Sequence, residues 1–180
     1  FIFYIINRGY FNYKINMIIR NWFNILFFIS LISLSSALVA EYYFNLQPCE
    51  LCLKQRHPYY FFIFSIIITY LIKNSYKFYS SLLNQVASLY GIFYSVWHVG
   101  VENKILKGPA GCSSNLSISS STGELKEQIF NKQVISCDEV VWSLFGLSAA
   151  SINTLVLLFI FIINAIYIYQ YYDQKKQKKA

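Results

Sequence analysis

Charged residues are scarce in this 180-residue chain, at 13% of the sequence, whereas hydrophobic residues make up 56%. Ordinary soluble domains carry about 25% charged residues, so this composition excludes that class and favours a membrane protein. The chain also lacks a glycine-rich dinucleotide fingerprint, a Cys-x-x-Cys-His haem attachment site and any cysteines beyond four. It contains a single methionine, Met17, and we therefore expect the native start there, with residues 1–16 contributed by upstream reading.

Four apolar stretches approach the length of about 20 residues that a helix needs to cross the hydrocarbon of a bilayer. They cover residues 22–40, 58–72, 78–99 and 147–169. The first is longer than a typical signal-peptide core and lacks a well-spaced cleavage site, so we interpret it as a retained helix. We predict an all-α fold: one four-helix transmembrane bundle over residues 22–169, flanked by a segment 1–21 and a basic tail 170–180.

Basic residues assign the two sides of the membrane, because short loops rich in Lys and Arg stay in the cytoplasm. With both termini inside, the inner segments hold nine of the 15 basic residues and one acid, Asp173, for a net charge of +8 against −1 outside. The nine are Arg8, Lys14, Arg20, Lys73, Lys77, Lys175, Lys176, Lys178 and Lys179. The basic tail favours contact with anionic membrane lipid over nucleic acid.

All four cysteines then lie outside, where disulfides persist. Cys49 and Cys52 form a CxxC motif in the first outer loop, and Cys112 and Cys137 stand 25 positions apart in the second, residues 100–146. That second loop has a Ser-rich stretch, which we expect to be flexible, and over residues 124–134 a pattern typical of a short surface helix. A flexible loop can bring Cys112 and Cys137 together and can also carry one of them to another partner.

The CxxC motif suits redox chemistry, because the thiolate is the nucleophile and its pKa falls near a helix N-terminus or a cation. Proline is favoured in the first helical turn, so Pro48 indicates a helix that begins at residues 48–50 and carries both sulfurs on one face. Arg56 follows Cys52 one turn later, where it would stabilise a Cys52 thiolate or a reduced, anionic ligand.

Oxidation of a dithiol releases two electrons, and a lipid-soluble quinone is the acceptor that remains by elimination. His98 ends the third span at the depth of Arg56, which suits either a shared quinone pocket or an interfacial anchor. Asn153 is predicted to form hydrogen bonds between helices. Structural disulfides and a zinc site are the alternatives for the cysteines, but the 24 residues between the second pair are unlike the close-spaced couples of zinc sites.

Over residues 22–169 the chain resembles the bacterial disulfide bond formation protein B (DsbB) family. The most specific stretch is Gln47-Pro48-Cys49-Glu50-Leu51-Cys52-Leu53-Lys54-Gln55-Arg56. Further matching motifs are Trp97-His98-Val99-Gly100-Val101-Glu102, the Gly-Pro-x-x-Cys that ends in Cys112, Cys137-Asp138-Glu139, Trp142, and Leu144-Phe145-Gly146-Leu147-Ser148.

This resemblance implies an inner-membrane enzyme that reoxidises a periplasmic, thioredoxin-like partner of the DsbA type. The partner's thiolate would attack Cys112 and release Cys137. Electrons would then pass to the Cys49–Cys52 pair and on to ubiquinone or menaquinone, with Cys52 nearest the quinone. Arg56 would hold and polarise the quinone, and His98 is placed in the same pocket.

Two other interpretations stay open from the sequence. One is a thiol–quinone enzyme similar to vitamin K epoxide reductase, a family that carries its CxxC in the last helix of the bundle. The other is a non-enzymatic membrane scaffold with structural disulfides. The CxxC before the second span argues against the first.

Overall fold

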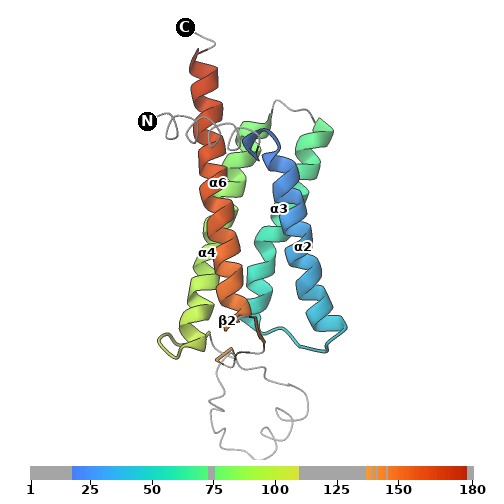
Figure 1. Cartoon of the computed structure of the whole chain (residues 1–180), viewed down its shortest axis with the longest axis vertical. Coiled ribbons are helices and arrows are strands. Elements are labelled where there is room, and N and C mark those ends of the chain that lie inside the picture. The colour runs from blue at the N-terminus through green and yellow to red at the C-terminus, as the bar shows by residue number, and fades with distance from the viewer. Residues whose placement is uncertain are drawn as a thin grey trace, which may run out of the picture.

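Four long helices make up most of the computed structural model, which describes residues 18–72, 76–109, 137–138, 140, 142–144 and 146–177. They are α2 (Trp22–Tyr42), α3 (Glu50–Ile72), α4 (Lys77–Glu102) and α6 (Ala149–Gln177), and they run side by side along the molecule (Figure 1). The prediction of a mainly helical fold is therefore confirmed, whereas the crossing of a membrane by all four helices stays a prediction. The predicted surface helix at 124–134 lies outside the described residues.

A small hairpin precedes α6 and was not predicted from the sequence. Its strands β1 (Ser143–Leu144) and β2 (Leu147–Ser148) pair antiparallel, with Ser143 opposite Ser148. Gly146 in the turn has φ = 80°, a left-handed conformation that glycine adopts without steric cost. The hairpin leads directly into the first turn of α6.

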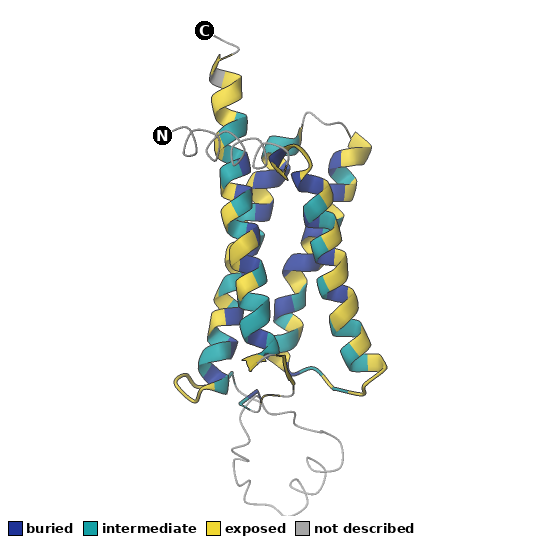
Figure 2. Ribbon diagram, in the orientation of Figure 1, coloured by how far each residue is buried: buried dark blue, intermediate teal, exposed yellow. Residues whose placement is uncertain are grey.

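The helices pack chiefly as α4 against α6, α3 against α4, and α2 against α3. Buried positions lie mostly on the sides of the helices that face the other helices, and exposed positions lie on the outside of the bundle (Figure 2). The main core includes the fully buried residues Trp22, Leu26, Phe62, Ile66, Leu157 and Ile160. Within it, the Trp22 indole donates to Asn164 Oδ1 at 3.1 Å and so ties α2 to α6.

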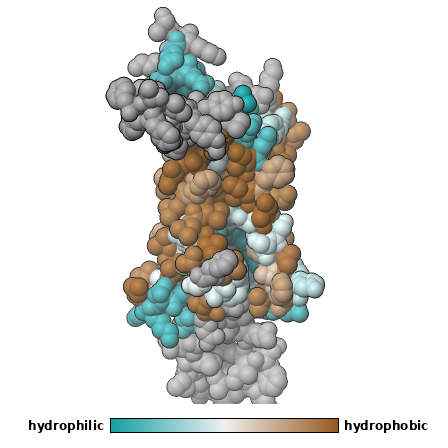
Figure 3. Space-filling model, in the orientation of Figure 1, coloured by the Kyte–Doolittle hydropathy of each residue, from teal (hydrophilic) through white to brown (hydrophobic). Residues whose placement is uncertain are grey.

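Helix α4 has the reverse of the pattern of a water-soluble helix, which buries its apolar stripe. It buries small and polar residues: Ser80, Ser81, Asn84, Ser88, Gly91, Ser95 and His98. Its exposed positions include Leu83, Val86, Leu89, Phe93 and Val96. On the face shown in Figure 3, hydrophobic residues cover the middle of the molecule. Lipid accepts such a surface, whereas water does not, and interhelical contacts in membranes favour small and polar residues.

Two of the described helices, over Trp22–Tyr42 and Ala149–Lys175, are long and apolar enough to cross a membrane. The 21 residues of α2 span about 32 Å at ~1.5 Å per residue, close to the ~30 Å hydrocarbon core of a bilayer. Helices α3 and α4 are less apolar: α3 carries Lys54, Gln55 and Arg56 in its first turns, and the buried face of α4 is rich in small and polar residues. The apolar helices and the outward apolar face of α4 together support a membrane protein.

Gly91 allows α3, α4 and α6 to approach closely. A Cβ atom on Gly91 would lie 2.7 Å from Pro58 Cγ of α3 and 2.9 Å from Leu157 Cδ1 of α6. Helix α3 runs without interruption through Pro58, so this proline neither ends nor restarts the helix. The close contact sets the distance between α3 and α4 two turns before His98.

Candidate dithiol site

Cys49 occupies the N-cap position of α3. Its carbonyl oxygen accepts a hydrogen bond from the Leu53 amide at 3.1 Å, and its sulfur accepts one from the Cys52 amide at 3.3 Å. The predicted start of the helix at residues 48–50 is thus confirmed, although Pro48 lies before the cap and not in the first turn. A helix N-terminus carries partial positive charge and stabilises an anion at this position.

The two sulfurs of the CxxC motif are reduced. They lie 3.0 Å apart, well beyond the ~2.05 Å of a disulfide bond. The hydrogen bond between the two sulfurs lowers the pKa of Cys49 to about 4, assisted by His98 and by the Cys52 amide, while burial opposes the shift. These interactions favour Cys49 as the thiolate of the pair and Cys52 as the thiol.

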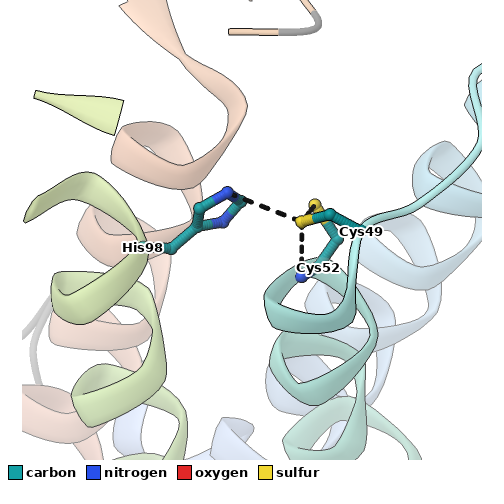
Figure 4. A group of neighbouring side chains, drawn as sticks. All are labelled: Cys49, Cys52 and His98. Atoms are coloured by element: carbon teal, nitrogen blue, oxygen red, sulfur yellow. Dashed lines mark hydrogen bonds between the residues drawn. The ribbon is translucent and has the colours of Figure 1, made fainter. Parts of the chain in front are cut away.

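His98 faces this thiolate from α4 (Figure 4). Its Nε2 atom lies 3.7 Å from Cys49 Sγ, and its Nδ1 atom lies 2.7 Å from Gln55 Nε2. Glu102, one turn further along α4, brings a carboxylate oxygen to 3.9 Å from the same Nε2. The side chains of His98 and Glu102 are both almost fully buried, so a protein-lined environment surrounds the Cys49 sulfur.

A cavity of about 190 Å³ opens beside the two cysteines. Its walls come from all four long helices and from Trp142, and it brings together four predicted site residues: Cys49, Cys52, Arg56 and His98. Next to it runs an apolar groove of about 720 Å³, lined by Leu31, Ile32, Ser35, Val39 and Phe44. The groove and the cavity share four lining residues: Ser36, Ala40, Leu46 and Trp142.

Arg56 is already paired in this site. Its guanidinium forms a part-buried ion pair with Glu41 in the last turn of α2 and donates to the Ala37 carbonyl at 3.5 Å. Sequence reasoning did not find Glu41 as a partner. The available signal was an acid at the end of an otherwise uncharged span. A direct role for Arg56 beside Cys52 stays a prediction.

Cys137 reaches the same end of the bundle. It is 1% exposed, takes part in a disulfide, and belongs to one buried cluster with Cys49, Leu51 and Val101. Cys112 lies outside the described residues. The structure therefore brings three predicted site elements together: the CxxC pair, His98, and one cysteine of the second pair.

The side chains around the dithiol could also be ligands of a metal ion. Cys49, Cys52 and His98 offer three donor atoms within 4.8 Å of one another among the described residues. A structural zinc site usually takes four protein ligands. Cys137, which lies in the same buried cluster, is not available as a thiolate because it is disulfide-bonded. The donor set fits a redox-active dithiol better than a closed zinc site.

A buried, acidic cysteine in a CxxC motif at a helix N-terminus defines the site of a dithiol–disulfide oxidoreductase. Residues 19–167 match the protein-family model described as "Disulfide bond formation protein DsbB", and the chain belongs to this family. An uncharacterised protein of Rickettsia prowazekii (strain Madrid E), RP370, is 33% identical over 134 residues, which cover 73% of this chain and 77% of that protein. No solved structure gives a significant match. Family membership assigns the chain to disulfide bond formation.

Proposed function

We propose that this protein is an inner-membrane thiol oxidase. It reoxidises a periplasmic, DsbA-like dithiol partner and passes the electrons through two cysteine pairs to ubiquinone or menaquinone. The observation that carries the proposal is the reduced Cys49–Cys52 pair, which holds a stabilised thiolate and faces a cavity between the helices. Family membership supports the disulfide chemistry.

The residues around the cavity fit a quinone. Its polar wall includes the guanidinium of Arg56, which can donate to a carbonyl oxygen of a quinone ring, and the imidazole of His98, which lines the cavity beside the dithiol. The adjoining groove, lined mainly by apolar side chains, suits an isoprenoid tail. When bound, a quinone supplies an acceptor for two electrons and two protons. Arg56 and His98 would orient the ring beside the dithiol.

The electrons pass through the cysteines in two thiol–disulfide exchanges. A partner thiolate attacks Cys112, breaks the Cys112–Cys137 bond and releases the Cys137 thiolate; the partner's second thiolate then displaces Cys112, so the partner leaves oxidised. In the second exchange Cys137 attacks the oxidised Cys49–Cys52 pair at Cys49, the cysteine with which it shares a buried cluster. Cys112 then displaces Cys49, which restores the second disulfide and leaves the first pair reduced.

The low pKa of Cys49 favours the second exchange. A thiol with a lower pKa leaves faster, and stabilisation of the reduced form makes the corresponding disulfide a stronger oxidant. The Cys52 thiol, His98 and the helix N-terminus all stabilise the Cys49 thiolate. They therefore favour the transfer of electrons from the second pair to the first.

All four long helices cross the membrane in this proposal, with both termini cytoplasmic and the cysteines periplasmic. The charge distribution along the sequence and the outward apolar face of α4 support this topology. Alkaline phosphatase fused within residues 100–146 should be active, whereas a fusion after residue 180 should not. The reverse pattern would overturn the orientation.

The position of the dithiol weighs against the alternatives. The CxxC motif begins α3, the second of the four long described helices, whereas enzymes similar to vitamin K epoxide reductase carry it in the last helix of the bundle. A scaffold with structural disulfides would not need a buried pair of reduced cysteines with an acidic sulfur.

Purified protein in detergent tests the function. With a reduced thioredoxin-like partner and ubiquinone, it should reduce the quinone, as followed by ultraviolet absorbance, and absence of reduction would refute the oxidase. Given the partner in its disulfide form, Cys137→Ala should trap a mixed disulfide between Cys112 and the partner on a non-reducing gel, because the Cys112 thiol attacks the partner disulfide and releases one partner thiol. If the matched variant Cys112→Ala traps the partner equally well, the assignment of Cys112 as the attacked cysteine is wrong.

A further inference from the structure

A continuous chain of hydrogen bonds links the bundle interior to the Cys49 sulfur. It begins at the Tyr59 hydroxyl, passes through Asn153 of α6 and Gln55 of α3, and reaches His98 of α4. His98 then faces Cys49 across 3.7 Å. Every link joins side chains from different helices, so the chain fixes groups that no single helix could position.

The donors and acceptors in this chain have one consistent direction. The Tyr59 hydroxyl donates to Asn153 Oδ1 at 2.6 Å, which leaves the Asn153 amide nitrogen to donate to Gln55 Oε1 at 2.9 Å and to Ser95 Oγ at 2.6 Å. The Gln55 oxygen is thereby committed to Asn153. The Gln55 amide nitrogen must then face His98, and an amide NH₂ group can only donate.

His98 Nδ1 therefore accepts a hydrogen bond, from Gln55 Nε2 at 2.7 Å, and carries no proton. A neutral imidazole with an unprotonated Nδ1 has its proton on Nε2, because the hydrogen bond at one ring nitrogen fixes the other. Both groups near Nε2, the Cys49 sulfur and the Glu102 carboxylate at 3.9 Å, are acceptors and agree with this assignment.

We propose that Gln55 and Asn153 are positioning residues that hold His98 in its Nε2–H tautomer, so that His98 donates to the Cys49 sulfur. The role of that sulfur in electron transfer rests on the proposed function, but the tautomer does not. With the opposite tautomer His98 would present a lone pair to the thiolate, and the stabilising hydrogen bond would be lost. The thiolate keeps its other stabilising groups, the Cys52 thiol and the Cys52 amide.

The same bundle contains a matched control. Gln85 of α4 accepts from Asn164 Nδ2 of α6 at 2.7 Å and donates to the Phe161 carbonyl at 3.3 Å. This Gln–Asn pair is also interhelical, but it connects to Trp22 and not to a cysteine. Gln85→Leu therefore removes an equivalent amide pair without touching the His98 chain.

Nitrogen-15 NMR of the reduced full chain in detergent, labelled at histidine, reads the tautomer directly and needs neither quinone nor partner. The chain has two histidines, and His57→Gln assigns the signals of His98. We expect His98 to have a protonated Nε2 and an unprotonated Nδ1 in the parent and also in Gln85→Leu, which leaves Gln55 intact. Gln55→Glu should protonate Nδ1, because a carboxylate accepts where the amide donated. Gln55→Leu should leave a mixture of tautomers.

Alkylation of Cys49, located by mass spectrometry across a pH series, gives a second readout. Because only part of the His98 population then donates, Gln55→Leu should slow alkylation at mildly acidic pH, and by less than the about tenfold expected for complete loss of a hydrogen bond to a charged group. Gln85→Leu should react like the parent. A protonated Nδ1 in the parent, or an unprotonated Nδ1 in Gln55→Glu, overturns the proposal even if Gln55→Leu fails to fold. Failure of quinone reduction with these NMR results intact would refute only the proposed function.

Discussion

Gly91→Ala tests the close packing that sets α3 against α4 and α6. The added Cβ would lie 2.7 Å from Pro58 Cγ and 2.9 Å from Leu157 Cδ1, closer than nonbonded carbons normally approach. Pro58 is a rigid ring in a buried position, so the helices must separate to admit the methyl group. Overpacking of this kind costs about 1–3 kcal/mol. Alanine also favours the helix over glycine by ~1 kcal/mol, which offsets part of the cost.

Gly100→Ala is the matched control in the same helix. Its Cβ would also meet an atom at 2.7 Å, but that atom is Leu106 Cδ1, the end of a flexible side chain that is 49% exposed. Both variants replace glycine by alanine in α4, so most of their difference reports the packing penalty. We expect Gly91→Ala to be less stable than Gly100→Ala by about 1–3 kcal/mol in unfolding by SDS titration, followed by circular dichroism. Equal stability, or the reverse order, would refute the packing argument.

Three further predictions concern the dithiol and its cavity. Because the pKa of Cys49 is lowered to about 4, its alkylation rate should stay constant as pH falls from neutrality and drop only near that value; a midpoint near the ordinary value for cysteine would contradict the assignment. Cys52→Ala, which removes the hydrogen bond that lowers this pKa most, should move the alkylation midpoint of Cys49 upward, whereas Cys52→Ser should retain part of the effect through its hydroxyl. Equal midpoints in these two variants would show that a Cys52 donor is not responsible. Glu41→Gln should release Arg56 from its ion pair and tighten the binding of ubiquinone, measured by quenching of tryptophan fluorescence; unchanged affinity would show that the pair does not restrain Arg56.

The long helices could be predicted from hydrophobicity, but their ends could not all be found that way. The second span was predicted at residues 58–72, whereas α3 begins at Glu50. The helical turns before residue 58 carry Lys54, Gln55 and Arg56. These polar side chains lower the mean hydropathy, so hydrophobicity alone did not predict a helix there. Pro48 indicated a start at residues 48–50, which agrees with α3 beginning at Glu50, although Pro48 itself lies before the N-cap.

The partners of the site residues were harder to predict than the residues themselves. Asn153 was expected to bond between helices, and it does, to Gln55 and Ser95. The specific pairs Arg56–Glu41 and Gln55–His98 depend on how each helix is rotated about its axis. An apolar face of a membrane helix can contact either lipid or a neighbouring helix. Hydrophobic periodicity alone therefore does not predict how each helix is rotated about its axis.

The most direct measurement of the central claim is a single turnover at the Cys49–Cys52 pair. Protein carrying Cys112→Ser and Cys137→Ser, reduced and then mixed with ubiquinone, should produce one quinol per chain and form the Cys49–Cys52 disulfide, as seen by mass spectrometry. A chain that leaves both cysteines reduced and the quinone unchanged would contradict the account.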